Sequence, residues 1–103
     1  MKKILFRADG SKDIGMGHLN RSSIVCREFI LNGHQANLLT KNNSHGLSFL
    51  KKRDISIRIL PTFRSMNDEI EFLSQQIIVE EPDILFLDVL NYVAYSELLE
   101  ICK

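Results

Sequence analysis

Four short apolar runs, separated by stretches of helical character, constrain the fold of this chain more than any other feature. The runs cover Lys3 to Arg7, Ala36 to Thr40, Ile55 to Leu60 and Ile84 to Leu87. Such an alternation is typical of βα units that wind around a parallel sheet. The first and last runs are continuously apolar, which predicts strands covered by helices on both faces. The third run alternates, which predicts an edge strand with one exposed face.

Helices are predicted between and after these runs. The first covers about Gly17 to Leu31 and ends at Asn32-Gly33, because glycine accepts the left-handed conformation that closes a helix. The second covers Ser44 to Lys52, with Ser44 as a possible N-terminal cap. We expect the last helix to begin near Tyr95.

The helix between the third and fourth runs has the clearest pattern. Its apolar residues repeat at i, i+4, i+7 and i+11, in Met66, Ile70, Leu73 and Ile77. Acidic Asp68 and Glu69 complement the positive end of the helix dipole, and Pro82 prevents the helix from continuing.

A single domain accounts for the whole pattern. The length of 103 residues and the hydrophobic content of 45% suit one domain that buries a core, and we expect one α/β domain over residues 1–103. Right-handed crossovers favour a parallel sheet of four strands in the order 3-2-1-4, which is half of a doubly wound sheet. Ligands of such sheets bind beyond the carboxyl ends of the strands where the winding reverses, here between the first and fourth strands.

Composition excludes several classes of protein. Thirteen Lys and Arg residues balance thirteen Asp and Glu residues, so no global charge attracts nucleic acid or an anionic membrane. No apolar run approaches the roughly 20 residues of a membrane-spanning helix, and the start of the chain does not resemble a secretion signal. Cys26 and Cys102 have no metal-type spacing. We expect a reduced, cytoplasmic protein without a metal or cofactor.

The segment after the first strand is unusually long. Ala8 to Met16 spans nine residues, whereas strand-to-helix connections take roughly 2 to 6. It leads into Gly15-Met16-Gly17-His18 at the start of the first helix, where backbone N–H groups favour an anionic ligand. Met16 stands where a Walker A loop has lysine, and the third glycine of a dinucleotide motif is missing. We expect a working loop that is neither of these.

His18 is the first candidate for chemistry. Near the first turn of a helix, the dipole disfavours the imidazolium, and a neutral imidazole can act as a general base toward water or a hydroxyl. The simpler interpretation is that His18 only packs or makes a hydrogen bond at the helix start.

Three further charged residues converge on the same crevice. Asp9 and Asp88 each follow the carboxyl end of a strand, where either could orient His18 or bind sugar hydroxyls, or only satisfy loop amides. Arg21 lies one turn after His18 and could clamp a phosphate or carboxylate, or form a structural ion pair with Asp9 or Asp88.

Other reactive side chains have ordinary roles in this interpretation. His34 at a helix exit and His45 in a polar loop are expected to be surface or capping residues. Cys26 falls on the apolar side of the first helix and is assigned to the core. The basic cluster Lys51-Lys52-Arg53 complements the end of the second helix and is interpreted as a solvated terminus rather than a nucleic-acid patch.

Together these residues carry a family resemblance. The pattern Arg7-x-Asp9-x-x-x-x-Ile14-Gly15-x-Gly17-His18-x-x-Arg21 resembles the N-terminal signature of the UDP-sugar hydrolases of nonulosonic (pseudaminic) acid synthesis and of the related spore-coat polysaccharide biosynthesis proteins. Weaker similarity through Gly33-His34 and residues 84–88 extends it over essentially the whole chain. The resemblance implies a Rossmann-like three-layer domain that forms one lobe of a two-domain fold similar to glycosyltransferases of the B type.

The resemblance also implies an activity. It is metal-independent removal of UDP from a UDP-linked diacetamido sugar by water attack at the anomeric carbon. His18 matches the catalytic histidine, Gly15 and Gly17 match the loop that approaches the substrate, and Asp88 matches the acid that ends the fourth strand. Asp9 and Arg21 are the remaining candidate substrate-binding residues. The segment Asp88-Val-Leu-Asn91 is more similar to the spore-coat branch than to the pseudaminic branch.

Members of this family carry a second Rossmann-like domain that holds most of the nucleotide contacts. We expect that domain to be absent from residues 1–103. It would then belong either to a longer protein of which these residues are the N-terminal part, or to a separate chain. Without it, we expect residues 1–103 to be weakly active or inactive. Two alternatives stay open: the acceptor-binding lobe of a glycosyltransferase, and a non-catalytic interaction module.

Overall fold

The computed structural model, described at residues 1–89, 95, 96 and 98, is an α/β Rossmann-like domain. Four parallel strands form one sheet in the order β3-β2-β1-β4, as the sequence predicts. Along the described chain, strands and helices alternate as β1 (Lys3–Ala8), α1 (Gly17–Leu31), β2 (Gln35–Thr40), α2 (Ser44–Leu50), β3 (Ser56–Ile59), α3 (Met66–Glu80) and β4 (Ile84–Asp88).

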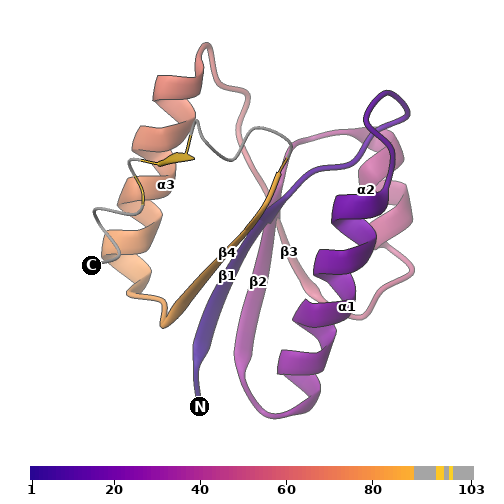
Figure 1. Ribbon diagram of the computed structural model, residues 1–103, viewed down its shortest axis with the longest axis vertical. Coiled ribbons are helices and arrows are strands. Elements are labelled where there is room, and N and C mark those ends of the chain that lie inside the picture. The colour runs from indigo at the N-terminus through magenta and orange to yellow at the C-terminus, as the bar shows by residue number, and fades with distance from the viewer. Residues whose placement is uncertain (90–94, 97, 99–103) are drawn as a thin grey trace.

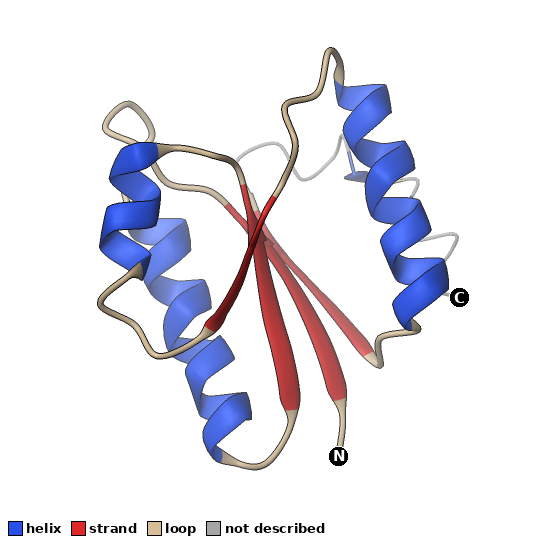
Figure 2. Cartoon of the chain, turned by 180° about the vertical axis from the view of Figure 1, so that it is seen from behind, coloured by secondary structure: helices blue, strands red, loops and turns tan. Residues whose placement is uncertain are grey.

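The elements form three layers, with α1 and α2 on one face of the sheet and α3 on the other (Figures 1 and 2). Alternate residues of β1 supply the two cores, because side chains of a strand point to opposite faces. Ile4 and Phe6 pack with Leu19 and Cys26 of α1, whereas Leu5 packs on the α3 side. The predicted core position of Cys26 is confirmed, with no exposed surface.

The sequence predicts the burial of β1 and the edge position of β3, but not the exposure of β4. β1 is covered on both faces and β3 is an edge strand, as expected. β4 was expected to be covered on both faces, but in the described part of the sheet it pairs only with β1 and stays partly exposed. Ile84 is 41% exposed and Ile59, at the end of β3, is 55% exposed. Apolar composition therefore does not by itself mean burial at the edges of this sheet.

The helix ends show how the sequence fixes each boundary. The predicted cap Ser44 is wrong: the cap of α2 is Asn43, whose side chain accepts a hydrogen bond from Gly46 N, and α2 ends at Leu50 rather than Lys52. Ser65 caps α3 by accepting from Asp68 N. Glu81 ends α3 in the left-handed conformation directly before Pro82.

The predicted last helix near Tyr95 falls mostly outside the described residues. Of that segment, Tyr95 and Leu98 are buried in the core on the α3 side of the sheet. This burial brings Tyr95 to the same face as Leu5 and Leu39.

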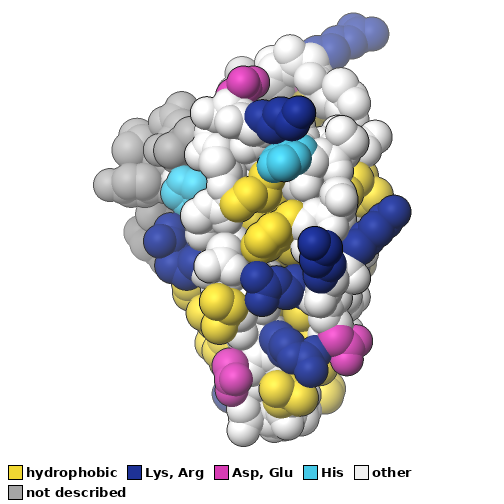
Figure 3. All heavy atoms as spheres, turned by 90° about the vertical axis from the view of Figure 1, so that its right-hand side faces the viewer, with side chains coloured by type: hydrophobic (Ala, Val, Ile, Leu, Met, Phe, Trp, Pro, Cys, Tyr) yellow, Lys and Arg dark blue, Asp and Glu magenta, His cyan; other side chains and the backbone are white. Residues whose placement is uncertain are grey.

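The face formed by α1 and α2 carries no gathered basic patch. Figure 3 shows Lys and Arg side chains spread over this face, with acidic and apolar side chains between them. Lys51 and Lys52 are exposed, as expected of a solvated helix terminus, whereas Arg53 is half-buried, lies over the Phe49 ring at 5.0 Å and donates to Asn20 Oδ1. None of the helices in the described ranges combines the length and apolar character that crossing a membrane requires.

Candidate active site

The loop between β1 and α1 is closed on itself. Ser11 and Gly15 exchange two backbone hydrogen bonds, and Gly15 adopts a φ of 81°, which glycine accepts without strain. The loop has eight residues, because β1 extends through Ala8. It delivers the chain directly to Gly17, the first residue of α1, so that His18 stands in the first helical turn.

A close backbone approach holds this loop against α2. A Cβ added at Gly46 would lie 2.6 Å from the carbonyl oxygen of Gly10, and one added at Gly10 would lie 2.6 Å from Leu19 Cδ1. Position 46 therefore needs glycine because its close neighbour is backbone, whereas a side chain at position 10 would require the Leu19 and Met16 side chains to shift. The sequence pattern singles out Gly15 and Gly17 but gives no sign of this contact, because Gly10 and Gly46 meet only in the folded chain.

Sheet topology brings His18 to Asp88. Asp88 is the last residue of β4 and is in register with Ala8, so the loop that follows Ala8 leaves the sheet beside it. His18 Nδ1 lies 2.6 Å from Asp88 Oδ1. Because a carboxylate can only accept, we assign the proton to Nδ1, which donates it to Oδ1, and Arg21 Nη2 lies 3.3 Å from the same nitrogen. Nε2 is then the nitrogen left for a ligand.

Asp88 is held as a carboxylate by its neighbours. Burial alone would raise the pKa of Asp88, but hydrogen bonds from Arg21, His18 and Ser22 and the charge of Arg21 lower it to about 2. The Arg21 guanidinium binds both carboxylate oxygens, and Ser22 donates to Oδ2 at 3.2 Å. The structure thus confirms the expected Arg21–Asp88 ion pair.

Asp9 is placed in the same crevice but does not touch His18. Its Oδ1 lies 2.7 Å from Arg7 Nη1, 2.9 Å from the Lys41 backbone nitrogen and 3.4 Å from Thr40 Oγ1. Burial alone would raise the pKa of Asp9, but Arg7 and Lys41 lower it. Within the described residues, no partner is recorded for Oδ2, which leaves that oxygen as an acceptor. The expected role with loop amides is therefore confirmed through Lys41.

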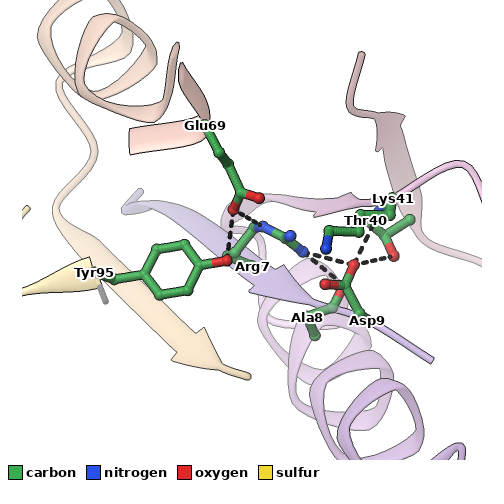
Figure 4. Close-up of polar contacts among 7 residues, drawn as sticks. All are labelled: Arg7, Ala8, Asp9, Thr40, Lys41, Glu69 and Tyr95. Atoms are coloured by element: carbon green, nitrogen blue, oxygen red, sulfur yellow. Dashed lines mark hydrogen bonds and ion pairs between the residues drawn. The ribbon is translucent and has the colours of Figure 1, made fainter. Parts of the chain in front are cut away.

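Behind Asp9 lies a buried polar network that sequence reasoning missed (Figure 4). Arg7, 1% exposed, donates from Nη1 to Asp9 and from Nε to Glu69 Oε2 at 3.0 Å. Tyr95 donates to the same Glu69 oxygen at 2.6 Å. Burial and this carboxylate raise the pKa of Tyr95. One guanidinium therefore links β1, the Asp9 loop and α3.

His18, Asp9 and Tyr95 are among the residues that surround a cavity of about 310 Å³, which we call the His18 compartment. Its lining combines polar groups with an apolar wall, a composition typical of small-molecule sites. The lining residues are Asp9, Ile14, His18, Lys41, Met66, Val89 and Tyr95. Four of them, Lys41, Met66, Val89 and Tyr95, were not among the predicted site residues.

Several predicted residues lie elsewhere. Gly15 and Gly17 shape the loop, while Ile14 and His18 are the loop and helix residues in the compartment lining. His34 Nδ1 accepts from the Lys2 backbone nitrogen, as expected of a structural histidine. His45 is exposed, as expected, but lies in α2 rather than in a loop.

Within the described ranges, no three His, Cys, Asp or Glu side chains are grouped as a metal site would require. Comparisons with protein-family models, with curated proteins and with solved structures find no match for this chain. The resemblance to UDP-sugar hydrolases therefore rests on the motif residues alone.

Proposed function

We propose that this chain is the base-bearing lobe of an enzyme that hydrolyses UDP-linked sugars in nonulosonic acid or surface polysaccharide synthesis. The observation that carries the proposal is the 2.6 Å contact between His18 Nδ1 and Asp88 Oδ1. A histidine held in this way by a buried carboxylate presents Nε2 as a general base. The motif around His18 supplies the substrate class, a UDP-linked diacetamido sugar.

The chemical step follows from this geometry. Nε2 of His18 takes a proton from a water molecule while the water oxygen forms a bond to the anomeric carbon of the sugar. The bond between that carbon and the diphosphate oxygen breaks, and UDP leaves with the electron pair. Asp88 stabilises the imidazolium that forms, as the carboxylate of a catalytic triad does.

The other site residues divide into two roles. Asp9 Oδ2, on a side chain that lines the His18 compartment, accepts a hydrogen bond from a substrate hydroxyl. Gly15 and Gly17 belong to the loop that approaches the substrate. Arg21 acts on Asp88, because its guanidinium already binds both oxygens of that carboxylate. The diphosphate and uridine are bound by a second Rossmann-like domain or chain, without which turnover is slow because the substrate is not held in register with the base.

The test is release of UDP from a UDP-linked diacetamido sugar by this chain together with its nucleotide-binding domain. We expect His18→Ala to lower kcat at least 100-fold, the lower range for loss of a general base. His45→Ala is the matched control, because His45 is an exposed histidine on α2, and it should keep the wild-type rate. A His18→Ala enzyme with the wild-type rate would refute the assignment.

Product analysis separates hydrolysis from its alternatives. Free sugar formed without any added acceptor supports hydrolysis, whereas turnover that requires an acceptor alcohol would identify a glycosyltransferase. An absence of turnover, with a concentration-dependent oligomer that His18→Ala leaves unchanged, would favour an interaction module. The tautomer is checked without turnover by nitrogen-15 NMR, in which the His18 proton should reside on Nδ1 in the wild type and lose this preference in Asp88→Ala.

A further inference from the structure

A second cavity adjoins the His18 compartment and has no role in the proposed hydrolysis. Its volume is about 330 Å³, and we call it the Glu69 compartment. It shares Lys41 and Met66 with the His18 compartment and lies between the end of β3 and the start of α3. Its own lining includes Thr62, Phe63, Ser65 and Glu69.

Glu69 gives this compartment a fixed hydrogen-bond acceptor. The side chain is 3% exposed, yet it lines the cavity. Its Oε2 accepts hydrogen bonds from both Arg7 and Tyr95 (Figure 4). Among the described residues no partner is recorded for Oε1. Because Glu69 is part of the cavity lining, this carboxylate oxygen can accept a hydrogen bond from a ligand or from water.

The charge of the network opposes an anionic occupant. Asp9 and Glu69 are two carboxylates that share the single guanidinium of Arg7, so the group keeps one net negative charge. A phosphate or carboxylate entering the Glu69 compartment would meet that charge in a partly desolvated place, where repulsion is stronger than in water. Lys41 also lines the cavity, but its side chain is exposed, so water and salt screen its charge more than that of the buried Glu69.

The rest of the lining suits a ring that carries hydroxyl groups. Phe63 and Met66 form an apolar wall, while Thr62 and Ser65 add hydroxyls that donate and accept. An apolar wall with a few oriented polar groups is the usual composition of a site for a small neutral ligand. The cavity is also large enough to be such a site.

We infer that the Glu69 compartment is a saccharide subsite that binds a neutral hydroxylated ring through Glu69 Oε1. This inference rests on the proposed function in one respect only: it places the ring beside the glycosidic bond that is hydrolysed with His18 as the base. A subsite here extends ligand recognition from one compartment to two, with Lys41 and Met66 between them.

The experiment is a titration of the full chain with methyl glucoside as the probe, in which nitrogen-15 NMR monitors binding. We expect weak binding, in the millimolar range, with shifts of the amides of residues 62–66 and 41. Thr62→Trp fills the cavity from an exposed position that is not part of the core, and should weaken binding at least tenfold. Ser48→Trp places the same side chain on the exposed surface of α2 and should leave binding unchanged.

Two further variants separate this inference from the proposed function. Glu69→Gln should weaken binding about tenfold, the effect of losing a hydrogen bond to a charged group. His18→Ala should bind methyl glucoside as the wild type does, whatever its effect on catalysis. Inorganic phosphate and glucuronate should each bind at least tenfold more weakly than methyl glucoside. Equal binding of phosphate or glucuronate, or an unchanged affinity in Thr62→Trp, would overturn the saccharide subsite.

Competition identifies which molecule provides the ring. If UDP-glucose displaces methyl glucoside from residues 62–66, the ring belongs to the nucleotide sugar. If both bind together, the ring belongs to a separate saccharide. Both results support the subsite, and the second would also direct the activity assay toward an acceptor.

Discussion

Arg21 of α1 reaches the end of β4 and binds both carboxylate oxygens of Asp88, with Nε 2.7 Å from Oδ2 and Nη2 2.6 Å from Oδ1. Such bidentate pairs fix orientation as well as charge. Because Asp88 Oδ1 also contacts His18 Nδ1, the position of the imidazole depends on a residue one turn further along the same helix. Arg21 is therefore a positioning residue for the candidate base.

Replacing Arg21 with Gln should raise the pKa of Asp88 from about 2 toward its ordinary value of 3.8, because the strongest hydrogen bonds to the carboxylate are lost. The lowered pKa contributes stability that is present above pH 3.8 and is lost as the pH falls toward 2. Because Arg21 is 59% exposed and water screens the pair, the contribution at neutral pH is about 1 kcal/mol. Carbon-13 NMR titration of the carboxyl group measures the pKa, and urea unfolding measures the stability.

The matched control for Arg21 is Arg27, another arginine of α1. It pairs with Asp54, which is 95% exposed, so Arg27→Gln should change stability by less than about 1 kcal/mol. The pKa of Asp88 should be the same in Arg27→Gln as in the wild type. An unchanged Asp88 pKa in Arg21→Gln would mean that the hydrogen bonds from His18 and Ser22, rather than Arg21, keep it low.

Arg7 is predicted to be the most sensitive charged residue for stability. Arg7→Met leaves the buried Glu69 and the partly buried Asp9 without the guanidinium that joins them. Removing one partner of a buried ion pair typically costs 3–5 kcal/mol. Urea unfolding should show a loss of about this size, against less than about 1 kcal/mol for Arg27→Met. Similar values for the two variants would show that the network contributes little.

The sequence predicts the sheet and the crevice shared by His18 and Asp88 for the same reason. Apolar runs and right-handed crossovers place the ends of the first and fourth strands side by side. Asp88 stands at the end of the fourth strand, and the loop after the first strand leads to His18 at the start of α1. To predict that these two segments meet, it is enough to know where the first and fourth strands end and in what order the strands pair. Strand order predicts the shared crevice but leaves open whether Asp9 or Asp88 contacts His18; the structure shows the contact with Asp88.

The buried network could not be predicted so directly. Glu69 was assigned to the helix dipole, although it lies three residues after Met66 and four before Leu73, on the apolar face of the helix. A charged residue on the apolar face of the helix was the sequence signal that Glu69 is buried. Its partners Arg7 and Tyr95 lie far away in the sequence and meet Glu69 only through tertiary packing, which no periodicity records.

The two glycines of the motif should respond differently to alanine. Gly15 has a φ of 81°, which alanine adopts only with strain, although no atom lies within 4 Å of an added Cβ. Gly15→Ala should therefore cost about 1 kcal/mol or more in urea unfolding. Gly17 begins α1 with open space around it, so Gly17→Ala should be neutral or stabilising. Equal losses in both variants would point to a requirement other than backbone conformation.

Cys26 should be inert in the folded protein. It has no exposed surface, and burial raises the pKa of its thiol from 9.0 to about 11. Because the thiolate is the reactive form, we expect the folded chain to react with Ellman's reagent at pH 8 far more slowly than the urea-unfolded chain. The measurement uses Cys102→Ser, so that the signal reports Cys26 alone, with Cys26→Ser as the blank.

The same raised pKa predicts how stability changes in alkali. The unfolded chain loses the thiol proton near pH 9.0, whereas the folded chain keeps it to about pH 11, so this contribution is complete below pH 9.0 and is lost as the pH rises between these values. Cys26→Ala removes the ionisable group and should unfold with a smaller decrease in stability over that range than the wild type. Equal decreases in the two proteins, together with rapid labelling of the folded chain, would show that Cys26 is accessible in solution rather than enclosed between α1 and the sheet.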